Sequence, residues 1–137
     1  MLALQNISAG YANDVAYPTG KITPGGVTDT LLSDYPNLFG DLSANSGNNA
    51  LSRDPEFTRA FLERHRDKLI FGSDCSCTDG HGGGISQANN PGASRLAGKC
   101  VARETLTLLE KTVTPAEFGK MTWENAHRVY ELPPASA

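Results

Sequence analysis

The order of apolar runs and helical signals is the feature that most constrains this fold. Two short apolar runs, at 37–44 and 68–74, are separated and followed by segments with helical patterns. Alternation of strand and helix patterns is typical of an α/β fold with a parallel sheet. Two strands leave two open sheet edges, however, and cannot cover the apolar faces of four helices. The pattern therefore predicts a piece of a larger α/β fold.

Each of the two runs has the pattern of a strand. In "NLFGDLSA" (37–44), Leu38 and Leu42 fall on one side and polar residues fall mainly on the other. "KLIFGSD" (68–74) is a short apolar run that stops at Gly72, which is typical of a buried parallel strand.

Several helices are expected around these strands. "VTDTLLSDY" predicts a short helix that ends before Pro36, since the residue before a proline disfavours helical backbone. In 52–68, Asp54 can cap the free N–H groups of a helix, and Pro55 suits its first position. The longest predicted helix covers 94–111.

The remaining segments complete a single domain over 1–137. Thr114 and Glu117 have capping-box spacing for a further short helix, and a last helix through "WENAHRVYEL" is expected to end at Pro133. Residues 1–26 and 79–94 are loop-like, because glycine and proline cluster there.

Charge and composition exclude several classes of protein. The net charge of −3 argues against binding to nucleic acid, which requires a basic face. The apolar stretches are too short for a transmembrane helix, and "MLALQNISAG" lacks the pattern of a secretory signal, so no membrane partner is expected. Three cysteines without an export signal predict reduced thiols in a cytoplasmic protein.

The stretch "LIFGSDCSCTDGHGGG" holds the main candidate site. In parallel α/β folds, polar residues just beyond the carboxyl end of a strand tend to carry the chemistry, and Asp74 lies there. Its carboxylate could bind a divalent metal and take a proton from the metal's water. Alternatively, Asp74 caps the following turn.

Thiols and a histidine in the same stretch allow a second metal hypothesis. Cys75, Cys77 and His81 suit zinc, but a structural zinc site needs four ligands. Cys100 or His127 could complete it only if the chain folds back. Alternatively, the two nearer cysteines are simply small residues at a strand end. Of the other histidines, His65 is expected on the solvated surface beside two arginines, and His127 is expected to pack one turn from Trp123.

Four segments together resemble the C-terminal part of the amidohydrolase-related proteins, a family of metal-dependent hydrolases and decarboxylases. The segments are "YPNLFGDLSANSG", "DPEF", "RHRDKLIFGSDC" and "TWENAHRVYEL". The resemblance implies a partial (β/α)8 TIM barrel, with "NLFGDLSA" as the seventh strand and "LIFGSDC" as the eighth. Asp74 then corresponds to the strand-eight aspartate that binds the catalytic divalent metal, most often zinc, and helps to activate its water.

The family's other metal ligands have no counterparts in this sequence. The family uses a His-x-His after strand one and histidines after strands five and six, whereas His65, His81 and His127 all follow the seventh strand. We therefore expect this chain alone to be inactive. It would be a truncation or fragment, or it would complete its barrel with a partner, for example as a homo-oligomer.

The resemblance also places a substrate-binding loop, "SANSGNNALSRD" (43–54), at the mouth of the barrel. Four residues in or beside this loop are candidates to line a pocket for a small molecule with an amide, ester or carboxyl group: Asp41, Asn45, Asn48 and Asn49. Alternatively, they are turn-forming residues. A non-enzymatic hypothesis also stays open. In this hypothesis, the chain is a catalytically silent α/β module that self-associates.

Overall fold

A small parallel sheet lies at the centre of a mostly helical α/β structure. The computed structural model describes residues 2–10, 17–75, 77–81 and 95–134. Its three strands are β1 (Leu2–Ala3), β2 (Gly40–Asp41) and β3 (Leu69–Ile70), in the order β1-β2-β3. Both strand pairs are parallel, and Gly40 lies opposite Leu2 on one side and Leu69 on the other. The two predicted strands are confirmed, while β1 falls in the segment 1–26 that was predicted to be loop-like.

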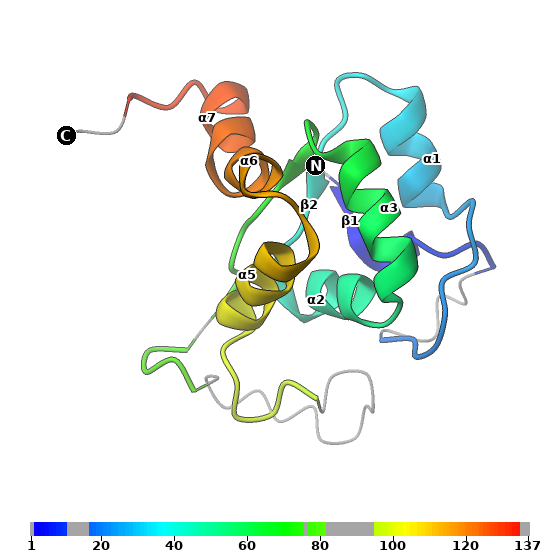
Figure 1. Cartoon of the computed structure of the whole chain (residues 1–137), viewed down its shortest axis with the longest axis horizontal. Helices are drawn as coiled ribbons and strands as arrows, with labels where there is room; N and C mark the ends of the chain where they lie inside the picture. Colours follow the sequence, from blue (N-terminus) through cyan, green and yellow to red (C-terminus); the bar gives the residue numbers. More distant parts are fainter. Residues whose placement is uncertain (1, 11–16, 76, 82–94, 135–137) are drawn as a thin grey trace.

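The first helices occupy the two connections between the strands. The 3-10 helix η1 (Leu4–Asn6) and α1 (Val27–Asp34) lie between β1 and β2, and α2 (Ala44–Ser52) and α3 (Pro55–His65) lie between β2 and β3. Figure 1 shows α1 and α3 to one side of the strands and the helices that follow β3 to the other. Each crossover therefore contains at least one helix, as parallel strands require.

In the described part of the chain, four helical segments follow β3. They are α5 (Val101–Thr112), α6 (Pro115–Gly119), the π-helix η2 (Lys120–Glu124) and α7 (Asn125–Val129). The predicted capping box is confirmed, because Thr114 Oγ1 accepts from the N–H of Glu117 at 3.3 Å and Glu117 Oε2 accepts from the N–H of Thr114 at 3.0 Å. The last predicted helix is present, but its first turn is the π-helix.

The predicted start of α3 is also confirmed. Pro55 is its first residue, and Asp54 Oδ1 accepts from the N–H of Phe57 at 3.3 Å. The other carboxylate oxygen of Asp54 accepts from the N–H of Ile22 at 3.0 Å, so this cap also fixes the segment that precedes α1. These hydrogen bonds to the ionised form lower the pKa of Asp54.

Two predictions about where helices lie were wrong. The segment 43–54, expected to be a loop, forms α2, because Ala50 and Leu51 enter the core and the buried amide of Asn48 is hydrogen-bonded. The long helix expected over 94–111 begins only at Val101. Gly98 has a φ of +71°, which a right-handed helix cannot contain, so the chain turns there before α5 starts.

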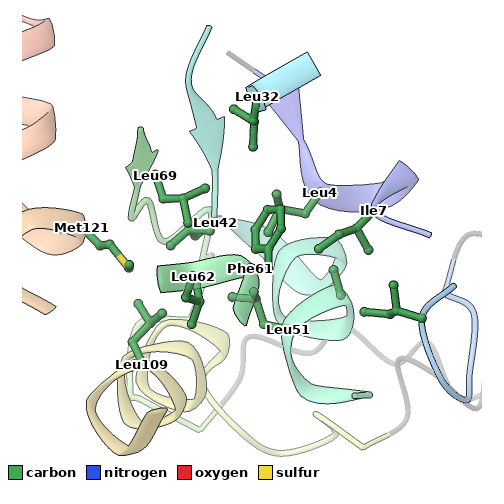
Figure 2. Packing of buried hydrophobic residues seen from close by; sticks show 12 residues of the cluster. Leu4, Ile7, Leu32, Leu42, Leu51, Phe61, Leu62, Leu69, Leu109 and Met121 are labelled. Carbon is green, nitrogen blue, oxygen red and sulfur yellow. The ribbon is translucent and has the colours of Figure 1, made fainter. Parts of the chain in front are cut away.

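One apolar cluster joins the sheet to helices from both halves of the chain. Figure 2 shows Phe61 of α3 at its centre, beside Leu42 and Leu69 from the ends of the strands. Burying each such side chain contributes about 1.5–3 kcal/mol. The cluster is completed mainly by Leu4, Ile7, Ile22, Leu32, Ala50, Leu51, Leu62, Leu109 and Met121.

His65 contradicts its prediction as a surface residue. Its side chain is only 2% exposed, and Nε2 lies 2.7 Å from Asp29 Oδ1 on α1. Arg64 contacts the same carboxylate through two hydrogen bonds of 2.8 and 2.9 Å from its Nη2. The imidazole therefore links α1 to α3. Burial lowers its pKa, and the neighbouring Asp29 partly opposes that effect.

The C-terminal helices are tied directly to β3. The N–H of Phe71 donates to the carbonyl of Met121 at 2.8 Å. The side-chain amide of Asn125 donates to the carbonyls of Arg66 and Leu69, both at 2.8 Å. The structure thus fixes the strand that leads to Asp74 against η2 and α7.

Candidate functional site

The carboxyl ends of β2 and β3 lie side by side at one end of the sheet. We call this end of the sheet, where the strands terminate, the strand-end edge. The N–H of Leu42 donates to the carbonyl of Ile70 at 3.0 Å, and that of Ala44 donates to the carbonyl of Ser73 at 3.4 Å. Asp41 lies at this edge, and its Oδ1 accepts from the N–H of Ser43 at 2.9 Å. The segments after both strands therefore run side by side.

Asp74 follows β3 at the same edge and has an unusual backbone. It lies four residues after Ile70, its side chain is exposed, and its φ is +40°. Non-glycine residues with positive φ are uncommon and concentrate at functional sites. Among the described residues, none donates a hydrogen bond to its carboxylate. In the turn that follows, the N–H of His81 donates to Asp79 Oδ1 at 2.9 Å and not to Asp74.

The structure places the predicted substrate-binding residues in different surroundings. Asn45 is half-buried on α2. Asn48 is 2% exposed, and its Nδ2 donates to Thr105 Oγ1 at 2.8 Å. Asn49 is 4% exposed and donates to the carbonyl of Pro18 at 3.0 Å. The amides of Asn48 and Asn49 thus hold α2 in place, whereas Asp41 lies at the strand-end edge.

Asn48 also lines a hollow of about 280 Å³ between α2, the segment before α5 and α5 itself. Arg95 borders this hollow, and its Nη1 donates to Asn48 Oδ1 at 2.5 Å. The remaining lining residues are Ser52, Leu96, Lys99, Glu104, Thr107, Leu108 and Lys111. The binding of a substrate by Asn48 stays a prediction.

Three thiols gather beside the strand-end edge, and we call Cys75, Cys77 and Cys100 the thiol cluster. The sulfur of Cys75 lies 3.0 Å from that of Cys77 and 3.5 Å from that of Cys100. All three sulfurs lie within 4.8 Å of one another. Cys100 therefore does fold back to the earlier pair. His81 and His127, the other predicted candidates, do not belong to the cluster.

Hydrogen bonds make Cys75 unusually acidic. Contacts with the thiol and then the N–H of Cys77 lower the pKa of Cys75 to about 7, with smaller contributions from the Cys100 thiol and the N–H of Ala102. A thiol with such a pKa is about half ionised at neutral pH, and the thiolate is the form that binds metals and attacks electrophiles. The sequence revealed the pair at 75 and 77, but its third member lies 25 residues away.

The pairing of the two outer strands indicates whether the sheet could extend to further strands. Within the described ranges, β1 and β3 each pair with β2 and with no other strand. Beyond β3, the chain bonds instead to η2 through Phe71 and Met121.

The chain matches no family model, no curated protein and no solved structure. None of the helices in the described part of the chain has the length and apolarity to cross a membrane.

Proposed function

We propose that this chain is the C-terminal portion of a metal-dependent hydrolase of the amidohydrolase-related type. In this proposal, β1, β2 and β3 are three consecutive strands of a (β/α)8 barrel. The observation that carries it is the position of Asp74, an exposed carboxylate four residues beyond β3 in a sequentially ordered parallel sheet. Chemistry in barrels of this type takes place at that end of the strands.

The topology of the sheet supports the proposal. Neighbouring strands of a (β/α)8 barrel are parallel and consecutive in sequence, as are β1, β2 and β3. Helices lie in both crossovers, and further helices follow β3. Within the described residues, the outer edges of β1 and β3 have no strand partner, as is expected if further barrel strands flank them.

The ligands in this chain do not make a complete catalytic zinc site. Such a site takes three protein ligands and a water molecule. The described residues contain no group of three possible ligand atoms that includes Asp74. Under the proposal, the other ligands come from barrel strands outside this chain, and the isolated chain is inactive. The contribution of Asp74 is one metal-binding carboxylate that also accepts a proton from the attacking water.

The proposed substrate is a small molecule that carries an amide, ester, lactone-like or carboxyl group. Asp41 is the residue of this chain best placed to contact it, because its carboxylate lies at the strand-end edge close to Gly72, two residues before Asp74. The reaction class is hydrolysis or, for a carboxylic acid, decarboxylation.

The DNA upstream of the codon for Met1 tests this proposal. We expect it to continue in the same frame and to encode a His-x-His motif followed by a further histidine at a strand end. In this proposal β1 takes the place of strand six, and no histidine lies between it and β2. A stop codon in this frame before any such motif would contradict the proposal. Activity of the purified chain alone would contradict the claim that Asp74 needs ligands from elsewhere.

A second candidate function is self-association without catalysis. Several large apolar side chains are at least 39% exposed, among them Val27, Tyr35 and Trp123. Together with the outer sheet edges, they offer surface that a second copy could cover. Size-exclusion chromatography tests this candidate, and a monomer at all accessible concentrations would contradict it.

A further inference from the structure

The thiol cluster combines two parts of the chain that the fold holds in fixed positions. Cys75 and Cys77 lie on the segment that leaves β3, which is bonded to η2 through Phe71. Cys100 immediately precedes the first residue of α5 and is only 9% exposed. Helix α5 is in turn anchored by Leu109 in the core and by the bond between Thr105 and Asn48.

The spacing of the three sulfurs suits a tetrahedral ion. With zinc–sulfur bonds of about 2.3 Å, two thiolates on a tetrahedral zinc lie about 3.8 Å apart. The sulfurs of Cys75, Cys77 and Cys100 lie between 3.0 and 4.8 Å from one another, which brackets this value. Small changes of side-chain torsion therefore bring all three to the distance that zinc requires.

A disulfide accounts for the cluster less well. A disulfide joins two sulfurs at about 2.05 Å, and it would leave the third thiol without a covalent partner. None of the three cysteines forms a disulfide here, and the shortest sulfur–sulfur distance is 3.0 Å. Convergence of three thiols on one point is the arrangement of a metal site.

We propose that Cys75, Cys77 and Cys100 bind one Zn²⁺ ion as thiolates, with a water molecule as the fourth ligand. Each thiol gives its proton to solvent on binding, so the bound ion and its three thiolates carry a net charge of −1. Thiolates select soft and borderline ions such as zinc over magnesium or calcium. Cys75 and Cys77 are only half-buried, so the fourth position faces water. The site is separate from Asp74 and does not depend on the proposed hydrolase activity.

The test uses the purified, reduced chain and two metals as probes. Titration with Zn²⁺ against a competing chelator is expected to give one tight site per chain. Co²⁺ is expected to give the visible bands of a tetrahedral ion and near-ultraviolet charge-transfer absorption from thiolate to cobalt. X-ray absorption of the zinc form should show three sulfur ligands at about 2.3 Å.

Serine variants assign the ligands. We expect Cys75→Ser, Cys77→Ser and Cys100→Ser each to weaken zinc binding by more than about 100-fold, because even the loss of a group that only supports a ligand costs 10- to 100-fold. Asp79→Asn and His81→Ala are the controls and should leave the affinity unchanged, because neither residue belongs to the thiol cluster. Circular dichroism shows whether each variant folds. Cys75 and Cys77 are half-buried, so their serine variants are less prone to a folding defect than Cys100→Ser.

Several results would overturn the proposal. One is the absence of a stoichiometric zinc site in the reduced chain. Another is a cobalt complex without thiolate charge transfer. A third is zinc affinity that survives Cys77→Ser within tenfold in a folded variant. A disulfide within the thiol cluster, found by mass spectrometry after purification without added oxidant, would also contradict it.

Discussion

Replacing Asn125 with alanine should strongly destabilise the fold. Asn125 is 3% exposed, and its amide donates to the carbonyls of Arg66 and Leu69, both at 2.8 Å. Removing the amide leaves two carbonyls without this donor, that of Leu69 at a buried position and that of Arg66 at a partly buried one. Each loss of this kind costs about 1–2 kcal/mol, so we expect the free energy of unfolding to fall by about 2–4 kcal/mol.

The assay is urea unfolding followed by circular dichroism, with thermal melting as a second measure. For a chain of 137 residues, a loss of about 3 kcal/mol corresponds to a melting temperature lower by roughly 10 °C. Asn45→Ala is the matched control, because Asn45 is half-buried on α2 and should change stability by no more than about 0.5 kcal/mol. Equal stability of Asn125→Ala and Asn45→Ala would refute the claim that α7 is locked to β3 through this amide.

Three further predictions follow from buried contacts. Gly47→Ala should lower the free energy of unfolding by about 1–3 kcal/mol, since the new Cβ would lie 2.5 Å from the carbonyl oxygen of Leu42; an unchanged urea midpoint would contradict this close approach. Asn48→Ala should cost a similar 1–3 kcal/mol through the lost bond to α5, and a melting temperature equal to that of the parent chain would argue against it. Burial lowers the pKa of His65 below its ordinary value of about 6.5, so the unfolded chain binds more protons just below that pH. Stability should therefore fall on acidification below pH 6.5, and His65→Gln should flatten this dependence; a parent urea midpoint that rises on acidification would show that the charge of Asp29 outweighs burial.

Elements with strong local signals could be predicted from the sequence. The start of α3 depends on Asp54 and Pro55, and the start of α6 depends on Thr114 and Glu117. These residues satisfy the free N–H groups of a first turn without help from distant parts of the chain. The strands at 40–41 and 69–70 likewise fall within short apolar runs that local pattern reveals.

Elements that depend on distant partners could not be predicted in this way. The segment of α2 is polar and contains Gly47, and it is helical because of contacts such as that between Asn48 and Thr105, 57 residues apart. His65 lies among arginines, so its local pattern indicates a surface position, but its partner Asp29 is 36 residues away.

The candidate site also has one part that the local sequence predicts and one part that depends on packing. A carboxylate after the last strand is a local feature, so Asp74 could be named from sequence. The sequence showed the thiols at 75 and 77, but only the placement of α5 brings Cys100 to them. A site assembled from two segments becomes visible only when the packing between them is known.

The most direct test of the central claim is the zinc content of the longer protein encoded with the in-frame upstream sequence. Asp74→Asn should lose one equivalent of zinc relative to Asp79→Asn, a control at another exposed aspartate five residues along the chain. Equal zinc content in the two variants would contradict the assignment of Asp74 as a metal ligand at the end of a barrel strand.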